Sequence, residues 1–216
     1  MNPKIEAEKR LAAEAAADLV EAGMAVGLGT GSTVAHLLPA LAARALDIRC
    51  VATSVATQEA ARSQGIAVDD FTEHGRLDIA IDGADQVAPD GWLVKGGGAA
   101  PTREKIVAAA ADRFVVIADS TKPVDAISAP IPLELLEFGL ASTLHALEPT
   151  ELRDVPRSPD GNLIADYLGD VGEPAALATR LAGVPGVVEH GLFPPELVSE
   201  VLVGRGDSVE RIALID

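Results

Sequence analysis

The chain has 216 residues, of which 48% are hydrophobic and 23% charged, so it can bury a sizeable core and is not a disordered chain. The formal net charge of −16 argues against nucleic acid or an anionic membrane surface as partner, and any anionic ligand needs a local positive site. Cys50 is the only cysteine, which excludes an internal disulfide and fits a reducing compartment. The polar, charged opening "MNPKIEAEKR" does not resemble a secretory leader, and no apolar run is long enough to span a bilayer. We therefore expect a cytoplasmic protein with no membrane partner.

The first 120 residues alternate between amphipathic, alanine-rich segments and short apolar runs. The former predict helices and the latter predict strands. We expect helices over 3–22, 33–46, 55–65 and 102–111. We expect strands over 24–29, 47–53, 66–71, 77–82 and 112–119. Such alternation is typical of parallel strands with helices on both faces, so the sequence predicts an α/β fold with a Rossmann-like, mostly parallel sheet.

The alternation stops where Pro123, Pro130 and Pro132 follow one another within ten residues. Beyond them the sequence predicts helices over 137–148 and 173–182, and strands over 151–155 and 163–167. The turn sequence Asp160-Gly161 between these strands indicates antiparallel pairing.

These patterns predict two domains. We expect a smaller α+β domain over 129–198. Residues 1–128 and 199–216 are expected to form the Rossmann-like domain, because the tail holds two short apolar strands that can return to the first sheet.

The segment "GLGTGST" (27–33) lies between a predicted strand and a predicted helix. Open parallel sheets bind ligands at this place, where free N–H groups and the helix dipole attract phosphate. A dinucleotide fingerprint would need glycine at position 32 or 34, and a Walker loop would need a lysine. The hydroxyls of Thr30, Ser32 and Thr33 around Gly31 instead suit a phosphate monoester. The alternative is a tight turn with a Ser/Thr helix cap.

The segment "DIAIDGADQV" ends a strand with Asp82 and Asp85, separated by Gly83 and Ala84. Asp is common in ordinary turns, where it bonds the local backbone. Alternatively, the two acids face one cleft, where they act on hydroxyl protons or bind a divalent metal. No histidine or third acid lies at a convincing spacing, so proton chemistry is favoured over metal binding.

The segment "KGGGAAPTREK" begins with Lys95 and continues through Gly96, Gly97 and Gly98 into a helix that carries Glu104. Successive glycine N–H groups can form an anion-binding nest. A lone glutamate at this position would be read as an acid that complements the helix dipole. Three polar loops, at 30–33, 82–85 and 95–104, each follow the end of a predicted strand, and their combination favours a catalytic site.

Four segments together, "GLGTGST", "TSVATQEAA", "DIAIDGADQV" and "VKGGGAAPTREKIVA", closely resemble the A-type ribose-5-phosphate isomerases. Later segments, "ADSTKPVD", "SPDGNLIAD" and "GVPGVVEHGLF", extend the resemblance over nearly the whole chain. It departs from the family pattern at Gln86, where the family usually has Glu, and in the segment "LLEFGLASTLHAL" (135–147).

The resemblance implies interconversion of D-ribose 5-phosphate and D-ribulose 5-phosphate through an enediolate, in the non-oxidative pentose phosphate pathway. It implies that Glu104 is the general base and that Asp82, Asp85 and Lys95 line the catalytic cleft. The remaining residues expected at the substrate are Lys9, Thr30, Gly31, Ser32, Thr33, Gly83, Ala84, Gly96, Gly97, Gly98 and Lys122.

Proton transfer of this kind requires no cofactor, so we expect none and no metal. The expected partner is a small sugar phosphate, and we expect a homodimer or homotetramer. Two other functions fit the sequence less well. A sugar-phosphate-sensing regulatory domain would normally carry a basic DNA-binding segment, which this sequence lacks. A nicotinamide-dependent oxidoreductase is disfavoured by the failed glycine fingerprint.

Overall fold

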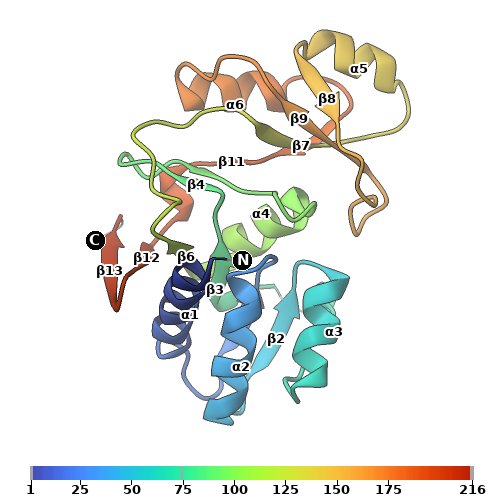
Figure 1. Ribbon diagram of the computed structural model, residues 1–216. Coiled ribbons are helices and arrows are strands. Elements are labelled where there is room, and N and C mark those ends of the chain that lie inside the picture. The colour runs from blue at the N-terminus through green and yellow to red at the C-terminus, as the bar shows by residue number, and fades with distance from the viewer. Residues whose placement is uncertain (1, 74, 215–216) are drawn as a thin grey trace. The chain divides into compact units, whose positions relative to one another are not determined.

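The computed structural model describes residues 2–73 and 75–214. Residues 1, 74, 215 and 216, all in the expected larger domain, lie outside this description. The chain forms two compact units (Figure 1). Unit 1 comprises Met1–Ala84, Glu104–Lys122 and Glu196–Asp216, and unit 2 comprises Asp85–Arg103 and Pro123–Pro195.

Unit 1 is built on a six-stranded sheet with the order β13-β12-β6-β3-β1-β2. Its strands are β1 (Ala25–Leu28), β2 (Arg49–Ala52), β3 (Leu77–Gly83), β6 (Ala111–Asp119), β12 (Glu200–Arg205) and β13 (Ser208–Ala213). All neighbours pair in parallel except β12 and β13, which form an antiparallel hairpin at the edge. The parallel strands are nearly continuous apolar runs, as expected of strands that are covered on both faces.

Helices cover both faces of this sheet. Helices α1 (Pro3–Ala17) and α2 (Val34–Arg44) pack on one face, against alternate strand residues such as Leu28 and Ile81. Helix α3 (Val55–Ser63) packs beside β2 and α2. Helix α4 (Pro101–Ala110) covers the other face, where a Cβ at Gly27 would lie 2.5 Å from the Cγ1 of Val107. This arrangement confirms the predicted Rossmann-like sheet.

Unit 2 contains two antiparallel sheets. The four-stranded sheet has the order β10-β7-β9-β8, and the three-stranded sheet has the order β11-β5-β4. The strands are β4 (Gln86–Val87), β5 (Leu93–Val94), β7 (Ile131–Leu135), β8 (Thr150–Leu152), β9 (Leu163–Tyr167), β10 (Val187–His190) and β11 (Leu192–Phe193). Helices α5 (Leu140–Ala146) and α6 (Pro174–Ala182) complete the unit. The core includes Leu133, Leu135 and Leu181, all fully buried.

Several observed elements differ from the predicted ones. Helix α1 ends at Ala17 and strand β8 at Leu152, earlier than the predicted ends at 22 and 155. Residues 66–71 form only an isolated bridge, between Val68 and Cys50, followed by the short 3-10 helix Phe71–Glu73. Helix α5 begins only after Gly139, whose φ is +75°. Residues 85–103 and 123–128, expected in the larger domain, group with unit 2. The division of the chain into a Rossmann-like domain and a smaller α+β domain stays a prediction.

Within the described ranges, no helix is both long enough and apolar enough to cross a membrane.

Candidate active site

Asp82 lies at the end of β3 against the first glycine-rich loop of unit 1. Its Oδ1 accepts the N–H of Thr30 at 3.0 Å and the N–H of Gly83 at 2.7 Å, and the residue is only 3% exposed. A Cβ at Gly29 would fall 1.9 Å from the Asp82 Cγ. Glycine is therefore required at position 29 by the close approach of this carboxylate, and the loop and the acid hold each other in place.

The hydroxyl residues of this loop differ in their surroundings. The Thr30 hydroxyl lies 2.7 Å from that of the buried Thr53, whereas Gly31 and Ser32 are exposed. Thr33 occupies the N-cap position of α2, but within the described residues its side chain makes no capping hydrogen bond. The Thr33 hydroxyl therefore does not cap α2, as the alternative interpretation of this loop as a capped turn would require. Exposed loop groups at a helix N-terminus form a suitable place for a phosphate.

Gly83 and Ala84 continue from Asp82 into the turn beside this loop. A Cβ at Gly83 would lie 4.0 Å from the Cβ of Thr33, in ordinary van der Waals contact. Unit 1 thus brings the Asp82 turn and the hydroxyl loop together, as the sequence predicted for strand ends of one sheet.

Lys9 is held by a carboxylate on its own helix. Its Nζ lies 2.9 Å from the Glu6 Oε1, and the other Glu6 oxygen lies 3.0 Å from the Nε2 of His36 in the first turn of α2. Hydrogen bonds from Lys9 and then from His36 lower the pKa of Glu6. Glu6 therefore links Lys9 to the helix that follows the hydroxyl loop.

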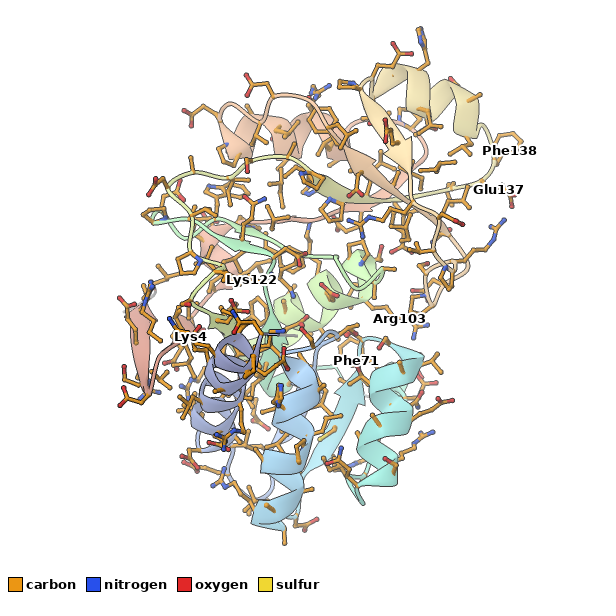
Figure 2. The ribbon with its side chains drawn as sticks, viewed as in Figure 1. Lys4, Phe71, Arg103, Lys122, Glu137 and Phe138 are labelled. Carbon is orange, nitrogen blue, oxygen red and sulfur yellow. The ribbon has the colours of Figure 1, made fainter. Side chains whose placement is uncertain are left out.

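Lys122, labelled in Figure 2, follows a turn after β6. The Lys122 N–H donates to the Asp119 carbonyl at 3.2 Å. The fully buried Glu8 of α1 fixes this turn, because its Oε2 accepts the Ser120 hydroxyl at 2.5 Å and the Ser120 N–H at 3.1 Å. The Glu8 Oε1 accepts the Gly206 N–H at 2.9 Å. Hydrogen bonds from Ser120 and Gly206 lower the pKa of Glu8, which favours the ionised form of this brace.

Glu104 lies in the first turn of α4 and is 2% exposed. An acid that only complements a helix dipole is normally solvated, because a buried charge costs far more than the dipole returns. The burial of Glu104 therefore favours a specific role for its carboxylate.

In unit 2, the second glycine-rich loop holds Asp85. The Oδ2 of this exposed aspartate accepts the Gly97 N–H at 2.9 Å. A Cβ at Gly97 would lie 2.6 Å from the Asp85 Oδ1, and Gly96 has a φ of +93°. Gly98 is exposed. The glycines thus bring the backbone close to Asp85, and one N–H group of the predicted nest, that of Gly97, donates to the Asp85 carboxylate.

Lys95 enters this loop as a buried cation, 2% exposed. Its Nζ lies 5.4 Å from the centre of the Phe193 ring, within range of a cation–π interaction. The backbone is fixed as well, because the Lys95 N–H donates to the Gly191 carbonyl at 2.8 Å.

The sequence did not point to two residues that hold this loop. The Arg153 Nη1 donates to the carbonyls of Gly96 and Gly97. The fully buried Glu134 accepts the N–H of Thr102, in the first turn of α4, at 3.3 Å. Both partners are more than thirty residues away in the chain, and no local motif marks such pairs.

Gln86 is a structural residue in unit 2. Its Nε2 donates to the Ser128 carbonyl at 2.7 Å, and its Oε1 accepts the Ser128 N–H at 2.9 Å. An ionised glutamate could make only the second bond, because it has no donor. The departure from the family pattern is therefore explained by a local backbone contact.

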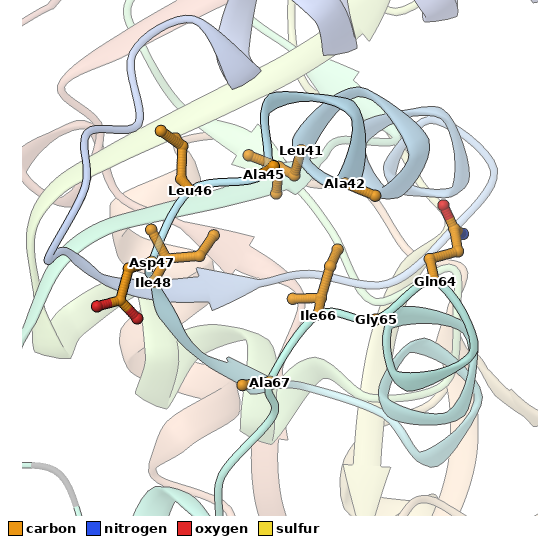
Figure 3. Close-up of a pocket in the computed structure, with 10 residues that line it drawn as sticks. All are labelled: Leu41, Ala42, Ala45, Leu46, Asp47, Ile48, Gln64, Gly65, Ile66 and Ala67. Atoms are coloured by element: carbon orange, nitrogen blue, oxygen red, sulfur yellow. The ribbon is translucent and has the colours of Figure 1, made fainter.

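A small cavity of about 220 Å³ in unit 1 contains none of the predicted residues (Figure 3). Its lining residues lie between Leu41 and Ile48, just before β2 begins, and between Gln64 and Ala67, just after α3 ends. The hydroxyl loop follows the carboxyl end of the parallel strand β1, so the cavity lies at the opposite edge of the sheet. No described group of three or more His, Cys, Asp or Glu side chains could hold a metal ion.

Residues 49–208 match the sequence family described as Ribose 5-phosphate isomerase A (phosphoriboisomerase A). A ribose-5-phosphate isomerase A of Caulobacter sp. strain K31 is 46% identical to this chain, over 95% of this chain and 97% of the relative. The crystal structure of ribose 5 phosphate isomerase A from Neisseria gonorrhoeae is 32% identical with a TM-score of 0.92, covering 100% of both chains. A D-ribose-5-phosphate isomerase solved in complex with phospho-erythronic acid is 32% identical with a TM-score of 0.91, over 99% and 100% of the two chains.

The sheet, the hydroxyl loop at a helix start and the buried Asp82 at the end of β3 define a Rossmann-like α/β protein whose unit 1 is suited to a small anionic ligand. With the matches above, the chain belongs to the ribose 5-phosphate isomerase A family and is an isomerase.

Proposed function

We propose that this chain interconverts D-ribose 5-phosphate and D-ribulose 5-phosphate, the isomerisation of the non-oxidative pentose phosphate pathway. Family membership supports the reaction, and the burial of the Glu104 carboxylate at the start of α4 is the observation that carries the mechanism. The solved relative that holds phospho-erythronic acid supports a sugar-phosphate ligand. That compound combines a phosphate with a planar carboxylate, which is similar in shape and charge to an enediolate.

Glu104 is proposed as the general base. Its carboxylate removes the C2 proton of the open-chain aldose, the C–H electron pair forms the C1=C2 bond, and the aldehyde oxygen takes the negative charge. Glu104 then returns the proton to C1. Its burial, at 2% exposure, keeps bulk water away from the intermediate.

Lys95 is proposed to stabilise the enediolate oxygen, because a buried ammonium group acts on developing charge without screening by water. Asp82 and Asp85 are proposed to move the hydroxyl proton from O2 to O1 and to assist ring opening. Each is oriented by a loop N–H, from Thr30 and from Gly97 respectively. Atoms and electrons balance without an oxidant or reductant, so we propose that no cofactor and no metal takes part.

The phosphate is proposed to bind at the hydroxyl loop, to Thr30, Gly31, Ser32 and Thr33. Exposed groups before α2 and the helix dipole support this assignment. Lys122 and Lys9 are proposed to supply the positive charge that a protein of net charge −16 must provide locally. The further proposed contacts to the sugar are those of Gly83, Ala84, Gly96 and Gly98.

The test is Glu104→Gln, which keeps the size of the side chain and removes the basic oxygen. We expect kcat for ribose 5-phosphate to fall by roughly 10²–10⁴-fold, the usual effect of losing a positioned general base. Exchange of the C2 proton with deuterated solvent should fall in parallel, while substrate binding by calorimetry stays near the parental value. The matched control is Glu173→Gln, because Glu173 is an exposed acid at the start of α6.

A folded Glu104→Gln protein that isomerises ribose 5-phosphate at close to the parental rate would contradict the assignment. It would transfer the role of the base to Asp82 or Asp85. A parental protein that forms no ketose from ribose 5-phosphate would overturn the reaction itself.

We also propose that the chain works in the cytoplasm as a homodimer or homotetramer. Support comes from large apolar side chains that unit 2 exposes: Phe138, labelled in Figure 2, is 93% exposed, and Leu136 is 46% exposed. Such side chains are typical of protein interfaces. Sedimentation equilibrium tests the assembly.

A further inference from the structure

Arg153 follows strand β8 in unit 2 and contacts the second glycine-rich loop. Its Nη1 donates to the Gly96 carbonyl at 3.1 Å and to the Gly97 carbonyl at 3.4 Å. Its Nε and Nη2 donate to the two carboxylate oxygens of Asp166, at 2.7 and 2.6 Å. One guanidinium group therefore connects the hairpin of β8 and β9 to the loop that follows Lys95.

The hairpin fixes this guanidinium firmly. The Arg153 N–H donates to the Ile164 carbonyl at 2.9 Å, and Asp166 is paired on both sides within the sheet, with Pro132 of β7 and Glu151 of β8. The side chains of Arg153 and Asp166 are only 18% and 20% exposed. A planar, bidentate pair that is partly buried keeps a defined orientation, which an exposed lysine would not.

The geometry of the peptide group then determines where the glycine N–H groups point. The described peptide bonds of this loop are trans, so the C=O and N–H of each peptide point in opposite directions. Both carbonyls converge on one nitrogen of Arg153, and the N–H groups of Gly97 and Gly98 therefore point away from it. The Gly97 N–H donates to the Asp85 Oδ2 at 2.9 Å.

A single peptide group thus lies between a cation on its oxygen side and a carboxylate on its hydrogen side. Hydrogen bonds arranged head to tail in this way polarise one another, and each strengthens the next. The Gly96 carbonyl also accepts the Ala99 N–H at 3.1 Å, so removing the guanidinium would take away the charged one of its two partners and would weaken the bond that orients Asp85.

We propose that Arg153 is a positioning residue for the isomerisation, acting on Asp85 through the Gly96–Gly97 peptide. The inference rests on the proposed function, in which Asp85 moves a hydroxyl proton. Arg153 itself does not touch the substrate. Its loss should therefore lower turnover more than substrate binding.

The first measurement is the steady-state kinetics of Arg153→Met on ribose 5-phosphate. We expect kcat to fall roughly 10- to 100-fold, less than the ~10²–10³-fold loss that follows removal of a direct oxyanion donor. KM should stay within about threefold, because the phosphate contacts are untouched. The matched control is Arg157→Met, because Arg157 belongs to the same hairpin, donates to the Gly161 carbonyl and pairs with Glu137, without contacting the glycine loop.

The second measurement is a double-mutant cycle with Asp85→Ala. If Arg153 acts through Asp85, Arg153→Met should lower kcat by no more than about threefold in the Asp85→Ala background. Amide hydrogen exchange gives a readout that does not depend on activity. The Gly97 amide should exchange roughly three- to tenfold faster in Arg153→Met, as expected for one weakened hydrogen bond.

Should Arg153→Met fail to fold, Arg153→Lys and Asp166→Asn take its place in the same cycle, with smaller effects in the same direction. An equal loss of kcat with and without Asp85, or a Gly97 amide whose exchange is unchanged, overturns the role of Arg153 and leaves the proposed function standing. A parental protein that does not isomerise ribose 5-phosphate overturns the proposed function, and this role with it.

Discussion

The two glycine-rich loops, one in each unit, both pass close to an aspartate, but different contacts hold them in place. In unit 1 the loop approaches Asp82, and a Cβ at Gly29 would lie 1.9 Å from its Cγ. In unit 2 the loop approaches Asp85, and a Cβ at Gly97 would lie 2.6 Å from its Oδ1. Each acid accepts a loop N–H, at 3.0 and 2.9 Å respectively. The glycines thus make room for acids of the same chain, so a glycine-rich loop is not in itself evidence of a bound anion.

The difference between the loops lies in what fixes them. Asp82 is 3% exposed and is held in a packed layer, where Thr30 also contacts the buried Thr53. Asp85 is exposed, and its loop takes its shape from the charged side chain of Arg153. Buried packing therefore determines the conformation of the first loop, and charge-assisted hydrogen bonds determine that of the second.

Adding a methyl group to each loop should affect the two loops very differently. Gly29→Ala should push the buried Asp82 out of place and lower the free energy of unfolding by roughly 1–3 kcal/mol, as overpacking of a core does. Gly97→Ala meets only the end of an exposed side chain, so stability should change by about 0.5 kcal/mol or less while kcat falls. Urea unfolding measured beside ribose 5-phosphate kinetics separates the two.

Equal losses of stability in Gly29→Ala and Gly97→Ala would remove the distinction between a packed loop and a charge-held one. If Gly97→Ala retains full activity, the second loop does not take part in the reaction.

Much of this organisation follows from the sequence, because it is local. The alternation of helix and strand patterns predicts the parallel sheet, and the turn chemistry at Asp160-Gly161 predicts the hairpin, where Gly161 adopts a φ of +86°. Asp82 lies at the end of one strand of the parallel sheet and Thr30 follows the end of another, which is sufficient to expect them at the same edge. Those two residues are indeed joined by a hydrogen bond.

The rest depends on contacts between distant residues. Residues 85–103 were expected with the larger domain, but their contacts with the 153–162 hairpin, such as that from Arg103 to Asp160 at 2.8 Å, group them with unit 2. The predicted strand at 66–71 has the right apolar alternation but pairs with Cys50 only at Val68. Nothing in a local window reveals which side chain will brace a loop 50 or 100 residues away.

The two loops are also expected to differ in what they contribute to the reaction. If the unit 1 loop binds phosphate, Ser32→Ala and Lys122→Ala should raise KM for ribose 5-phosphate, with Lys122→Ala giving roughly a tenfold effect, the usual range for a hydrogen bond to a charged group. The kcat should fall less, since remote binding energy also positions the substrate. Arg10→Ala is the control, because Arg10 is an exposed cation of the same unit that pairs with the exposed Glu14 of its own helix.

Isothermal titration with ribose 5-phosphate measures the same effect without turnover. If both variants bind ribose 5-phosphate as tightly as the parent, the phosphate does not lie at the unit 1 loop. The two loops would then not differ in that one binds substrate and the other supports turnover.

The smallest expected effect concerns the two fully buried glutamates that brace the units, Glu8 in unit 1 and Glu134 in unit 2. Hydrogen bonds from Ser120 and Gly206 lower the pKa of Glu8 in the folded protein. Because its folded pKa lies below the unfolded one, the stability that Glu8 contributes is present above the ordinary glutamate pKa of about 4.3, and is lost as pH falls through the folded pKa.

Glu8→Gln should therefore cost about 1 kcal/mol at pH 7, the usual value for weakening such hydrogen bonds. It should also flatten the decline of the unfolding free energy between about pH 5 and pH 3. Urea unfolding at each pH, for the parent and for Glu8→Gln, isolates this contribution, because all other carboxylates are common to the two proteins. Glu134→Gln is the matched comparison from unit 2, since its carboxylate accepts the Ser158 hydroxyl at 2.6 Å and the Asn162 side-chain N–H at 2.9 Å. If the parent and Glu8→Gln lose stability with the same slope, Glu8 is not an ionised brace, and the turn that carries Lys122 is held by its neighbours alone.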